Sequence, residues 1–576
     1  MRTIYLQFRE AAEKYNRRPI ARWKRKKRWH SLSYQKFLKK VDLLSGGFRK
    51  EGIKEGDRVA IMSENCPEWL MTDLALNKIG AVSVPIHITS NRPFIEYIVK
   101  DSMSGFFIVS EKVLKKHEET IKEIARNFKV AVIRRDAPFF SRSADEADMD
   151  VNAASAIGLR EELGKEYLDF DNLLSREYSD EPAADGKLAS LIYTSGTTGD
   201  PKGVMLTNEN FLTNAFGAME KIKVFPRDVF LSFLPLSHVL ERLAGSYVPI
   251  LSGAEVAYAP DIKELARSFS EVKPTIFTGV PKIFENSYEK IRAKLEKSNP
   301  LIKKFFYYSL NKKSPAFARA LADKFLYAKI RKSFGGRLRF AISGGAAINE
   351  RIIKFFRKIG VKIVEGYGLT ETSPIVAMNT LLESRIGSVG RPLPGVEIKI
   401  APDKEILVKG KSVMSGYWNK EEMTGTHFTE DGWFKTGDLG FLDRENFLTI
   451  IGRKKEMIVT TNGKNISPEK VEAIINLNPL VSQCLVTGHK KPYLACLIVP
   501  EYDRIKEKYG ADCDLEKCLA DEMEEINNHL MSHERIKKIA VIGSSFTVEA
   551  GELTPTLKVR RSVIEHKYRR EIERLY

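Results

Sequence analysis

One short stretch constrains this chain more than any other: residues 193–203, which read Tyr-Thr-Ser-Gly-Thr-Thr-Gly-Asp-Pro-Lys-Gly. Its glycines allow tight turns that bring backbone N–H groups close to an anion, while its hydroxyls and Lys202 add donors and charge. Apolar runs flank it at 188–193 and 204–206, so we expect the loop to join two strands. A kinase-type phosphate loop has another spacing and opens a helix. The stretch therefore predicts a cradle for nucleotide phosphates, with a plain surface turn as the weaker interpretation.

Helix-like and strand-like segments alternate along the chain, which predicts parallel sheets covered by helices. The expected strands are residues 58–62, 81–84, 105–109, 229–234, 254–257, 275–278 and 338–342, and expected helices are 34–50, 69–78 and 94–100. After residue 386 the pattern changes to short strands and turns, and after 452 it becomes that of a small α/β unit. We therefore predict an α/β protein. Its large N-terminal domain, residues 1–452, has parallel α/β sheets plus a small β-rich subdomain, and a small α/β C-terminal domain, residues 453–576, follows.

The chain is too long for one hydrophobic core and carries a formal net charge of +18. Such a charge favours nucleic acid, phosphorylated small molecules or an anionic membrane as partners. Because no RNA-recognition or zinc-finger signature is present, we expect no nucleic-acid partner. The five cysteines form no C-x-x-C pair, which favours a reducing compartment. No apolar run reaches about eighteen residues, so we expect a soluble or peripherally attached protein.

Two segments stand apart from this pattern. Residues 135–165 are acidic and rich in small side chains, which predicts a mobile surface insertion. Residues 303–332 are expected to be helical, and two interpretations are open: a membrane-facing basic amphipathic helix or helix pair, or a helix with its apolar side on the core. The second is our expectation. The apolar side chains concerned are Phe305, Phe306, Leu310, Phe317, Leu321, Phe325 and Ile330.

Residues 365–372 form a second cluster, Glu-Gly-Tyr-Gly-Leu-Thr-Glu-Thr. The glycines beside Tyr367 leave room for a base to stack on its ring. Thr370 and Glu371 lie next to each other and suit a phosphate and a hard cation. A strand-end turn with a capping carboxylate is the alternative interpretation of the same residues.

A third cluster, residues 343–347, follows an expected strand with Ser-Gly-Gly-Ala-Ala, where a ligand or neighbouring backbone must fit. Farther along, Asp438 and Arg453 are candidates for binding the hydroxyls of a ribose. A structural salt bridge explains these two residues equally well.

The motifs together resemble one family, the adenylate-forming (AMP-forming) synthetases and ligases. They occur in the family's order at residues 193–203, 343–347, 365–372, 436–438, 452–453 and Lys558, and the resemblance covers about residues 30–575. Within the family, the chain is most similar to the long-chain fatty acyl-CoA synthetases. That branch resembles it at residues 234–242, 335–346 and 553–558, and in the helical insertion before Gly335.

The resemblance implies a two-step reaction. A long-chain fatty acid attacks ATP to give acyl-AMP and pyrophosphate, and the thiol of coenzyme A then displaces AMP. Mg²⁺ is the implied metal. The implied protein is a cytoplasmic monomer or homodimer, with peripheral attachment to the inner face of an anionic membrane left open. Alternatives are a medium-chain or aromatic acid–CoA ligase, an acyl-AMP ligase that loads a carrier protein, a phosphotransferase, and a non-catalytic nucleotide-binding protein.

The resemblance also implies roles for single residues. The implied catalytic residues are Lys558, Glu371, Thr370 and His238; the acyl-binding residues are His238, Gly279 and Val280; the metal-binding residues are Thr197 and Glu371. The implied ATP-binding residues are Thr194, Ser195, Gly196, Thr197, Thr198, Gly199, Lys202, Gly344, Gly345, Glu365, Gly366, Tyr367, Thr370, Asp438, Arg453, Lys455 and Lys558.

The C-terminal domain of this family is mobile, and here it would rotate about Lys455. Lys558 would then serve adenylation, and residues 459–465 would build the thiol site afterwards. Two departures from the family pattern are Leu557, where many members have glycine, and the negative charge of Asp200 in the phosphate loop.

Overall fold

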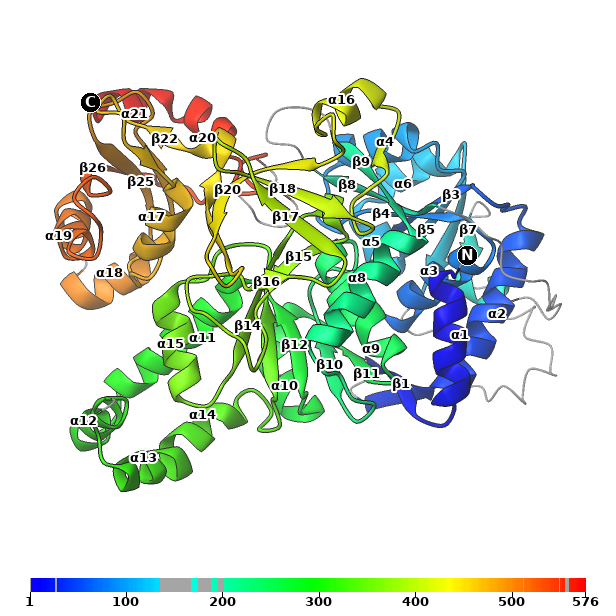
Figure 1. The fold of residues 1–576 in the computed structure, drawn as a ribbon, viewed down its shortest axis with the longest axis horizontal. Coiled ribbons are helices and arrows are strands. Elements are labelled where there is room, and N and C mark those ends of the chain that lie inside the picture. The colour runs from blue at the N-terminus through cyan, green and yellow to red at the C-terminus, as the bar shows by residue number, and fades with distance from the viewer. Residues whose placement is uncertain are drawn as a thin grey trace.

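Two large sheets with helices on their faces make up most of the molecule, and a smaller α/β part lies at the C-terminal end (Figure 1). This arrangement confirms the predicted fold class. The computed structural model describes residues 2–25, 28–134, 167–174, 188–194, 201–311, 313–510, 512–548, 550–554 and 559–576. The predicted insertion at 135–165, most of the phosphate loop and Lys558 lie outside these ranges.

The first sheet has the strand order β19-β9-β8-β4-β3-β5-β6-β7 and is parallel from β8 to β7. Its strands are β3 (Arg58–Met62), β4 (Val82–Pro85), β5 (Phe106–Ser110), β6 (Lys129–Ile133), β7 (Tyr167–Asp169), β8 (Leu188–Thr194), β9 (Lys202–Thr207) and β19 (Gly416–Tyr417). The antiparallel β8–β9 hairpin carries the glycine-rich stretch at its tip, so this stretch does join two strands.

The second sheet has the order β16-β15-β14-β13-β12-β10-β11-β1-β2 and is parallel from β14 to β1. Its strands are β1 (Pro19–Arg25), β2 (Arg28–Ser33), β10 (Val229–Ser232), β11 (Glu255–Tyr258), β12 (Ile276–Gly279), β13 (Phe340–Ser343), β14 (Ile363–Gly368), β15 (Ile375–Met378) and β16 (Arg391–Pro392).

Smaller sheets complete the molecule. One has the order β17-β18-β20-β21, with β17 (Val396–Ile400), β18 (Glu405–Gly410), β20 (Phe434–Leu442) and β21 (Leu448–Arg453). The C-terminal part contains β22 (Ile458–Val459), β23 (Asn465–Ile466), β24 (Val481–Thr487), β25 (Leu494–Pro500) and β26 (Ile536–Val541).

Helices connect most of these strands. In the N-terminal part they are α1 (Ile4–Lys14), α2 (Tyr34–Lys50), α3 (Pro67–Lys78), α4 (Arg92–Asp101), α5 (Glu111–Lys116), α6 (Glu118–Ala125), α8 (Asn208–Lys221), η3 (Glu241–Tyr247), α9 (Val248–Leu251), α10 (Leu265–Val272), α11 (Pro281–Glu296), α12 (Pro300–Ser309), α13 (Ala316–Ala322), η5 (Asp323–Tyr327), α14 (Ala328–Lys332), α15 (Glu350–Lys358) and η6 (Thr370–Thr372). Later helices are α16 (Glu421–Thr426), η7 (Lys454–Glu456), α17 (Pro468–Ile475), α18 (Tyr502–Tyr509), α19 (Leu515–Asn527), α20 (Arg561–Lys567) and α21 (Arg569–Arg574).

The alternation of apolar side chains explains the layers. In β3, Val59 and Ile61 face a core cluster shared by both sheets, whereas Ala60 and Met62 face a second cluster under α4, α5 and α6. A strand buried on both faces reads as a continuous apolar run, which is why 58–62 was predictable. The remaining predicted strands shift by only one or two residues. Helix α2 begins where predicted, because the Ser33 hydroxyl accepts a hydrogen bond from the Lys36 N–H.

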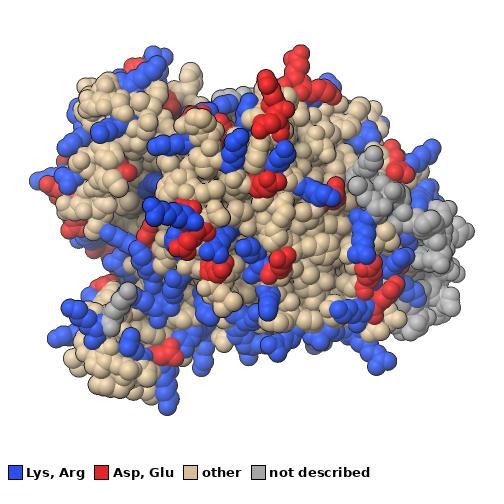
Figure 2. All heavy atoms as spheres, viewed as in Figure 1, with Lys and Arg blue, Asp and Glu red and all other residues tan. Residues whose placement is uncertain are grey.

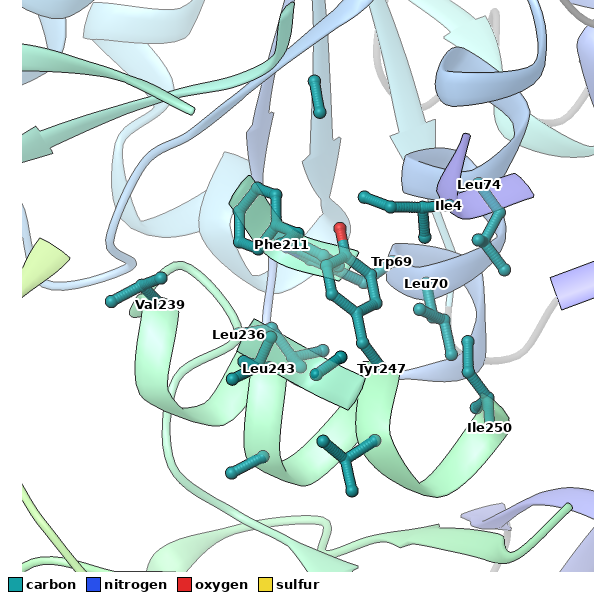
Figure 3. Packing of buried hydrophobic residues seen from close by; sticks show 14 of the residues in the cluster. Ile4, Trp69, Leu70, Leu74, Phe211, Leu236, Val239, Leu243, Tyr247 and Ile250 are labelled. Carbon is teal, nitrogen blue, oxygen red and sulfur yellow. The ribbon is translucent and has the colours of Figure 1, made fainter. Parts of the chain in front are cut away.

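The cluster between the two sheets contains α3, α8 and η3. Figure 3 shows Trp69 of α3, Phe211 of α8 and Tyr247 of η3 gathered there. In the same cluster lies Arg242, whose side chain is only 1% exposed. Its guanidinium lies 5.2–5.6 Å from the ring centroids of these three aromatic residues. A buried charge in such a place requires a counter-charge.

Asp73 of α3 supplies that counter-charge, and it too is buried. Arg242 donates to both Asp73 oxygens and to the hydroxyls of Ser190 (2.7 Å), Ser83 (2.6 Å) and Tyr247 (2.8 Å). The guanidinium thus joins α3, β4 and β8 of the first sheet to η3, which follows β10 of the second.

Glu241, the neighbour of Arg242 in η3, is fully buried. Its carboxyl group packs over Gly245, where an added Cβ would lie 2.4 Å from Oε1, so a larger residue there would displace this carboxyl group. Neither carboxyl oxygen makes a hydrogen bond of good geometry with the described residues. Burial raises the pKa of Glu241 to about 8, and the Ser232 hydroxyl acts in the opposite direction. The folded protein therefore holds a proton on Glu241 at neutral pH.

The segment from α12 to α14 corrects part of the sequence analysis. Residues expected to form a core-facing helix are divided among α12, α13, η5 and α14. Phe306 is buried, as that interpretation requires. The core-facing interpretation is wrong for Phe317, Leu321 and Phe325, whose side chains are exposed. Within the described residues, no helix is both long enough and apolar enough to span a bilayer.

Replacing Arg242 by methionine is expected to lower the free energy of unfolding by about 3–5 kcal/mol, because Asp73 would keep a buried and unpaired charge. The double variant Arg242→Met, Asp73→Leu should be less destabilised than the single variant, since it leaves no charge. Urea unfolding followed by circular dichroism measures both, with Tyr247→Phe as a control expected to cost about 1 kcal/mol. A single variant as stable as the control would contradict this account.

Replacing Glu241 by glutamine is expected to change how stability depends on pH. The pKa of this glutamate is about 4.3 in the unfolded chain and about 8 in the folded protein. Its contribution to the stability of the folded protein is therefore complete below about pH 4.3. That contribution is lost as the pH rises toward 8. Urea unfolding from about pH 5 to about pH 9 should therefore show the wild type losing stability relative to Glu241→Gln, by up to about 1.4 kcal/mol per pH unit. Parallel pH profiles of the two proteins would show that Glu241 is not the group responsible.

Candidate functional site

The carboxyl ends of three parallel strands bring several predicted residues together. Gly279 of β12, Ser343 of β13 and Glu365 of β14 lie side by side in the register of the sheet. Immediately after β13, the Gly344 N–H donates to the Gly279 carbonyl at 3.2 Å. This edge is where open parallel sheets bind ligands, so the strand order itself creates the candidate site.

Small residues at this edge allow other segments to approach. A Cβ on Gly344 would lie 3.1 Å from Leu240 Cδ2 and 3.7 Å from the Gly366 carbonyl oxygen. Gly345 has φ +84°, a conformation that strongly favours glycine, and a Cβ there would meet Val280. Leu240 donates its N–H to Nδ1 of His238 at 3.2 Å. The predicted acyl-binding segments therefore lie against the Gly344–Gly345 turn.

Electrostatics at the strand ends are unusual. Burial raises the pKa of Glu365 to about 8, nearby Glu350 adds to the rise, and Arg357 opposes it. Glu365 is therefore a neutral acid at neutral pH. Its backbone carbonyl accepts the N–H of Asn379, which fixes the start of the 365–372 segment.

A chain of three side chains connects the second sheet to the β17–β21 sheet. Tyr367 donates its hydroxyl to Asp438 Oδ2 at 2.6 Å, and Arg453 Nε lies 3.0 Å from Asp438 Oδ1. Asp438 and Arg453 face each other across β20 and β21. Burial, and then the Asp438 carboxylate, raise the pKa of Tyr367, so its hydroxyl remains a neutral donor. Three residues predicted to bind adenosine thus meet at one point.

A second group surrounds the base of the phosphate loop. Tyr417 donates its hydroxyl to Glu371 Oε1 at 2.9 Å, and Lys202 Nζ lies 5.2 Å from the centroid of the Tyr417 ring. Burial lowers the pKa of Lys202, Glu371 raises it, and the charges of Lys455 and Lys420 lower it further. Three lysines and one carboxylate therefore share this region, as a site for a polyphosphate and a cation requires.

The hairpin holds both ends of the loop. Thr194 of β8 pairs with Lys202 of β9, and the Trp418 N–H donates to the Gly203 carbonyl at 2.8 Å. The loop residues themselves lie outside the described part of the chain. They include five of the predicted ATP-binding residues: Ser195, Gly196, Thr197, Thr198 and Gly199.

The predicted hinge lies beside a charged anchor. Lys455 is exposed in η7, and its neighbour Lys454 pairs with Asp403 at 2.5 Å and with Glu405 at 2.8 Å. Glu405 also accepts the N–H of Gly437 at 3.0 Å, next to Asp438. One carboxylate therefore links the turn before Asp438 to the residue before the hinge. Lys558 is not described, although its flanking residues Leu553 and Val559 form an antiparallel bridge.

Sequence reasoning missed Tyr417, Glu405 and Lys454. Tyr417 follows a glycine and precedes a tryptophan at 416–418, which was a usable signal for a residue near a ligand. Glu405 and Lys454 gave no signal, because single charges in strands and turns resemble solvated surface residues. Their partners become neighbours only when β18, β20 and β21 form a sheet.

Comparison with known proteins agrees with this geometry. The sequence profile of the AMP-binding enzyme family matches residues 8–418, and the profile of the AMP-binding enzyme C-terminal domain matches residues 455–576. The chain is 34% identical to the long-chain-fatty-acid–CoA ligase FadD15 of Mycobacterium tuberculosis, over 95% of this chain and 92% of that protein. It is 30% identical to long-chain-fatty-acid–CoA ligase 6 of Mus musculus, over 100% of this chain and 87% of that protein.

Solved structures share the fold at lower identity. The adenylation domain of a carboxylate reductase from Mycobacterium chelonae superposes with a TM-score of 0.82 and 22% identity, covering 100% of this chain and 91% of that one. The anthranilate CoA ligase AuaEII, in complex with anthranoyl-AMP, gives a TM-score of 0.74 at 18% identity, covering 98% and 97%. Profiles, relatives and motif order agree, and the chain belongs to the AMP-binding enzyme family, as its resemblance to the adenylate-forming enzymes predicted.

Proposed function

We propose that this protein is a long-chain fatty acid–CoA ligase that works through an acyl-adenylate. A fatty carboxylate oxygen attacks the α-phosphorus of ATP, the bond to the β-phosphate oxygen breaks, and pyrophosphate leaves. The coenzyme A thiol then attacks the acyl carbon, AMP leaves, and the thiol proton is released. One observation carries the proposal: relatives matched over nearly the whole chain are named long-chain-fatty-acid–CoA ligases.

The charges around the phosphate loop suit the first step. A carboxylate and a triphosphate repel each other, so cations must neutralise both and hold them in line. Lys202, Lys420 and Lys455 provide positive charge near the loop base. We assign the grip on the β- and γ-phosphates to residues 195–202, and the α-phosphate contact to Thr370, which opens η6.

The residues present also fit Mg²⁺. Glu371 accepts a hydrogen bond through Oε1 from Tyr417, which orients its carboxylate beside Lys202. Mg²⁺ commonly binds one or two carboxylates together with substrate phosphates, so no larger acidic cluster is needed. We assign Glu371 and Thr197 to the metal, which would neutralise phosphate charge when bound.

For the nucleoside, we assign the face of the Tyr367 ring to adenine and Asp438 to the ribose. The Tyr367 hydroxyl and Arg453 both engage Asp438, which holds this carboxylate in place. Gly344, Gly345 and Gly366 leave room for the base, and the neutral Glu365 adds no charge beside it.

For the acid, we assign His238, Gly279 and Val280. The Gly344–Gly345 turn brings these segments close to the nucleotide residues. An acyl carboxylate held between them would lie next to the α-phosphate site, as in-line attack requires.

We further propose that residues 453–576 rotate about Lys455 between the two steps. Lys558 would stabilise the charge that develops during adenylation, and residues 459–465 would then form the thiol site. Two ion pairs, Lys297–Glu507 and Arg504–Glu289, connect α18 to the segment containing α11. Ion pairs at such exposed positions contribute only about 0–1 kcal/mol, which suits a part that must move.

The activity is tested with purified protein, ATP, Mg²⁺, free coenzyme A and a series of acids of increasing chain length. We expect AMP, pyrophosphate and an acyl thioester, with a preference for long chains. ADP as the nucleotide product would indicate a phosphotransferase. Absence of thioester with every free acid would refute the proposal in favour of a carrier-loading enzyme or a non-catalytic nucleotide binder.

Replacing Lys558 by alanine is expected to slow acyl-adenylate formation by about 10²–10³-fold, because a group that meets developing negative charge is lost. Pyrophosphate exchange measures this step. Thioester formation from supplied acyl-AMP should remain near the wild-type rate, since the second step does not use this lysine. Lys537→Ala, an exposed lysine of β26, is the matched control. Equal losses in both steps would contradict the assigned role.

Replacing Glu371 by glutamine should raise the Mg²⁺ concentration needed for half-maximal activity by about 10- to 100-fold, because the metal would lose a charged ligand. Tyr417→Phe removes only the hydrogen bond to Glu371 and should have a smaller effect in the same direction. Glu422→Gln, on exposed α16, makes the same charge change away from the site. A magnesium titration of Glu371→Gln that matches this control would remove Glu371 from the metal site.

A further inference from the structure

Helices α12, α13, η5 and α14 form a lobe, residues 300–332, that projects from the second sheet at the lower left of Figure 1. Of the eighteen large apolar side chains that are exposed in the described part of the chain, seven lie in this lobe. They are Leu301, Ile302, Tyr307, Tyr308, Phe317, Leu321 and Phe325. Single exposed apolar residues are ordinary, but such a concentration in one short segment marks a contact surface.

Four of these side chains, Leu301, Ile302, Leu321 and Phe325, help to line an open groove. Leu301, Ile302 and Phe305 of α12 line one side, and Leu321 of α13 with Phe325 and Leu326 of η5 lines the other. Phe317 and Leu301 are each 76% exposed, more than most apolar residues of a folded protein. The lining is almost wholly carbon, so water in the groove gains few hydrogen bonds.

The opposite side of the lobe is fixed to the core. The Phe306 ring packs against Tyr327 and Phe355, with centroid distances of 5.6 and 6.3 Å. The Ser309 and Tyr327 hydroxyls are 2.8 Å apart and share a hydrogen bond. Because these contacts hold α12 and η5 in place, the apolar groove is a built surface of the folded protein.

The lobe is strongly basic. Its residues 300–332 contain nine lysines or arginines and one acidic residue, Asp323. Asp323 is paired with Arg331 at 2.6 Å, so little negative charge remains on the surface. Figure 2 shows the lobe at the lower left as uncharged surface bordered mainly by basic side chains. Exposed members of this border include Lys304, Lys313 and Lys324.

We propose that this lobe docks on the surface of an anionic membrane. Its leucines and aromatic rings enter the boundary between headgroups and acyl chains, while the surrounding lysines and arginines contact lipid phosphates. Helical surfaces with aromatic and leucine side chains beside lysines bind membranes in this way. Each lysine or arginine near an anionic surface adds to the attraction, which salt weakens.

Charge and chemistry favour a bilayer over a protein partner. The occupant must be negative around an apolar centre, and an anionic membrane presents both at every point of its surface. The purpose of docking rests on the proposed function, because long-chain fatty acids reside in bilayers. Helix α11 begins directly after Val280 and ends next to the lobe. Its 16 residues span about 24 Å, so docking would place the predicted acyl segment about one helix length from the lobe that meets the membrane.

The test uses the full-length protein and flotation with vesicles. We expect binding to mixed phosphatidylglycerol–phosphatidylcholine vesicles at low salt, much weaker binding at high salt, and little binding to pure phosphatidylcholine. Phe317→Ser with Phe325→Ser should lower binding at least tenfold at either salt level. Lys304→Glu with Lys324→Glu should lower binding about tenfold at low salt and less at high salt. Lys36→Glu with Lys54→Glu, an equal charge change on exposed sites in α2 and after it, is the matched control and should bind like the wild type.

Activity with a short acid that dissolves as monomers separates this proposal from the proposed enzyme. The lobe variants should keep wild-type turnover of that acid and wild-type melting temperatures, because the replaced side chains are exposed. An enzyme that forms thioester but does not bind anionic vesicles would overturn docking and leave the enzymatic proposal intact. Lobe variants that bind like the control pair would overturn it as well. Lobe variants that change from dimer to monomer without losing vesicle binding would also overturn docking, since the groove would then be an interface between two copies.

Discussion

The buried ion pair between Arg242 and Asp73 is the interaction on which the rest of the structure depends. It connects the first sheet, through α3, β4 and β8, to the helical turn that follows His238. Because β8 leads into the glycine-rich stretch, the same guanidinium fixes the strand before that stretch relative to the predicted acyl segments. A buried charge pair is weak as a source of stability but strict in its geometry, since any movement leaves a charge unpaired. The pair therefore suits a protein whose site is divided between two sheets.

The candidate site is assembled from edges that are distant in sequence. Parallel strands β12, β13 and β14 end together, and the hairpin of the first sheet and the β20–β21 pair close the site from two sides. Polar contacts between side chains join these edges: Tyr367 to Asp438, and Tyr417 to Glu371. Glu405 extends the connection toward the proposed hinge by holding both Gly437 and Lys454. A shift at the proposed hinge would therefore affect Asp438, the residue assigned to the ribose.

Much of the fold could be predicted from the sequence, because its strands are short apolar runs buried on both faces. The strand 58–62 coincides with β3 for that reason, and the helix 34–50 coincides with α2, which begins at the Ser33 cap. Gly344, Glu365 and Asp438 could be proposed as site residues because glycines and acids interrupt or follow the apolar runs there. Tyr417 and Glu405 could not, since their roles depend on pairing between strands far apart in sequence. The prediction that the apolar side of α13 faces the core was wrong. An amphipathic period shows that one side of a helix is apolar, but it does not show what covers that side.

Part of the excess positive charge lies at the base of the phosphate loop, and part lies on the lobe of residues 300–332. The two places have different surroundings. Around the phosphate loop, Lys202 is partly buried and its charge is opposed by the neighbouring lysines, so it gains most from an anion that enters the site. On the lobe, Lys304, Lys313 and Lys324 are exposed, and salt screens such charges strongly. Partly buried charges are screened much less. The two sets therefore respond differently to ionic strength, and docking can weaken in salt while the attraction for nucleotide persists.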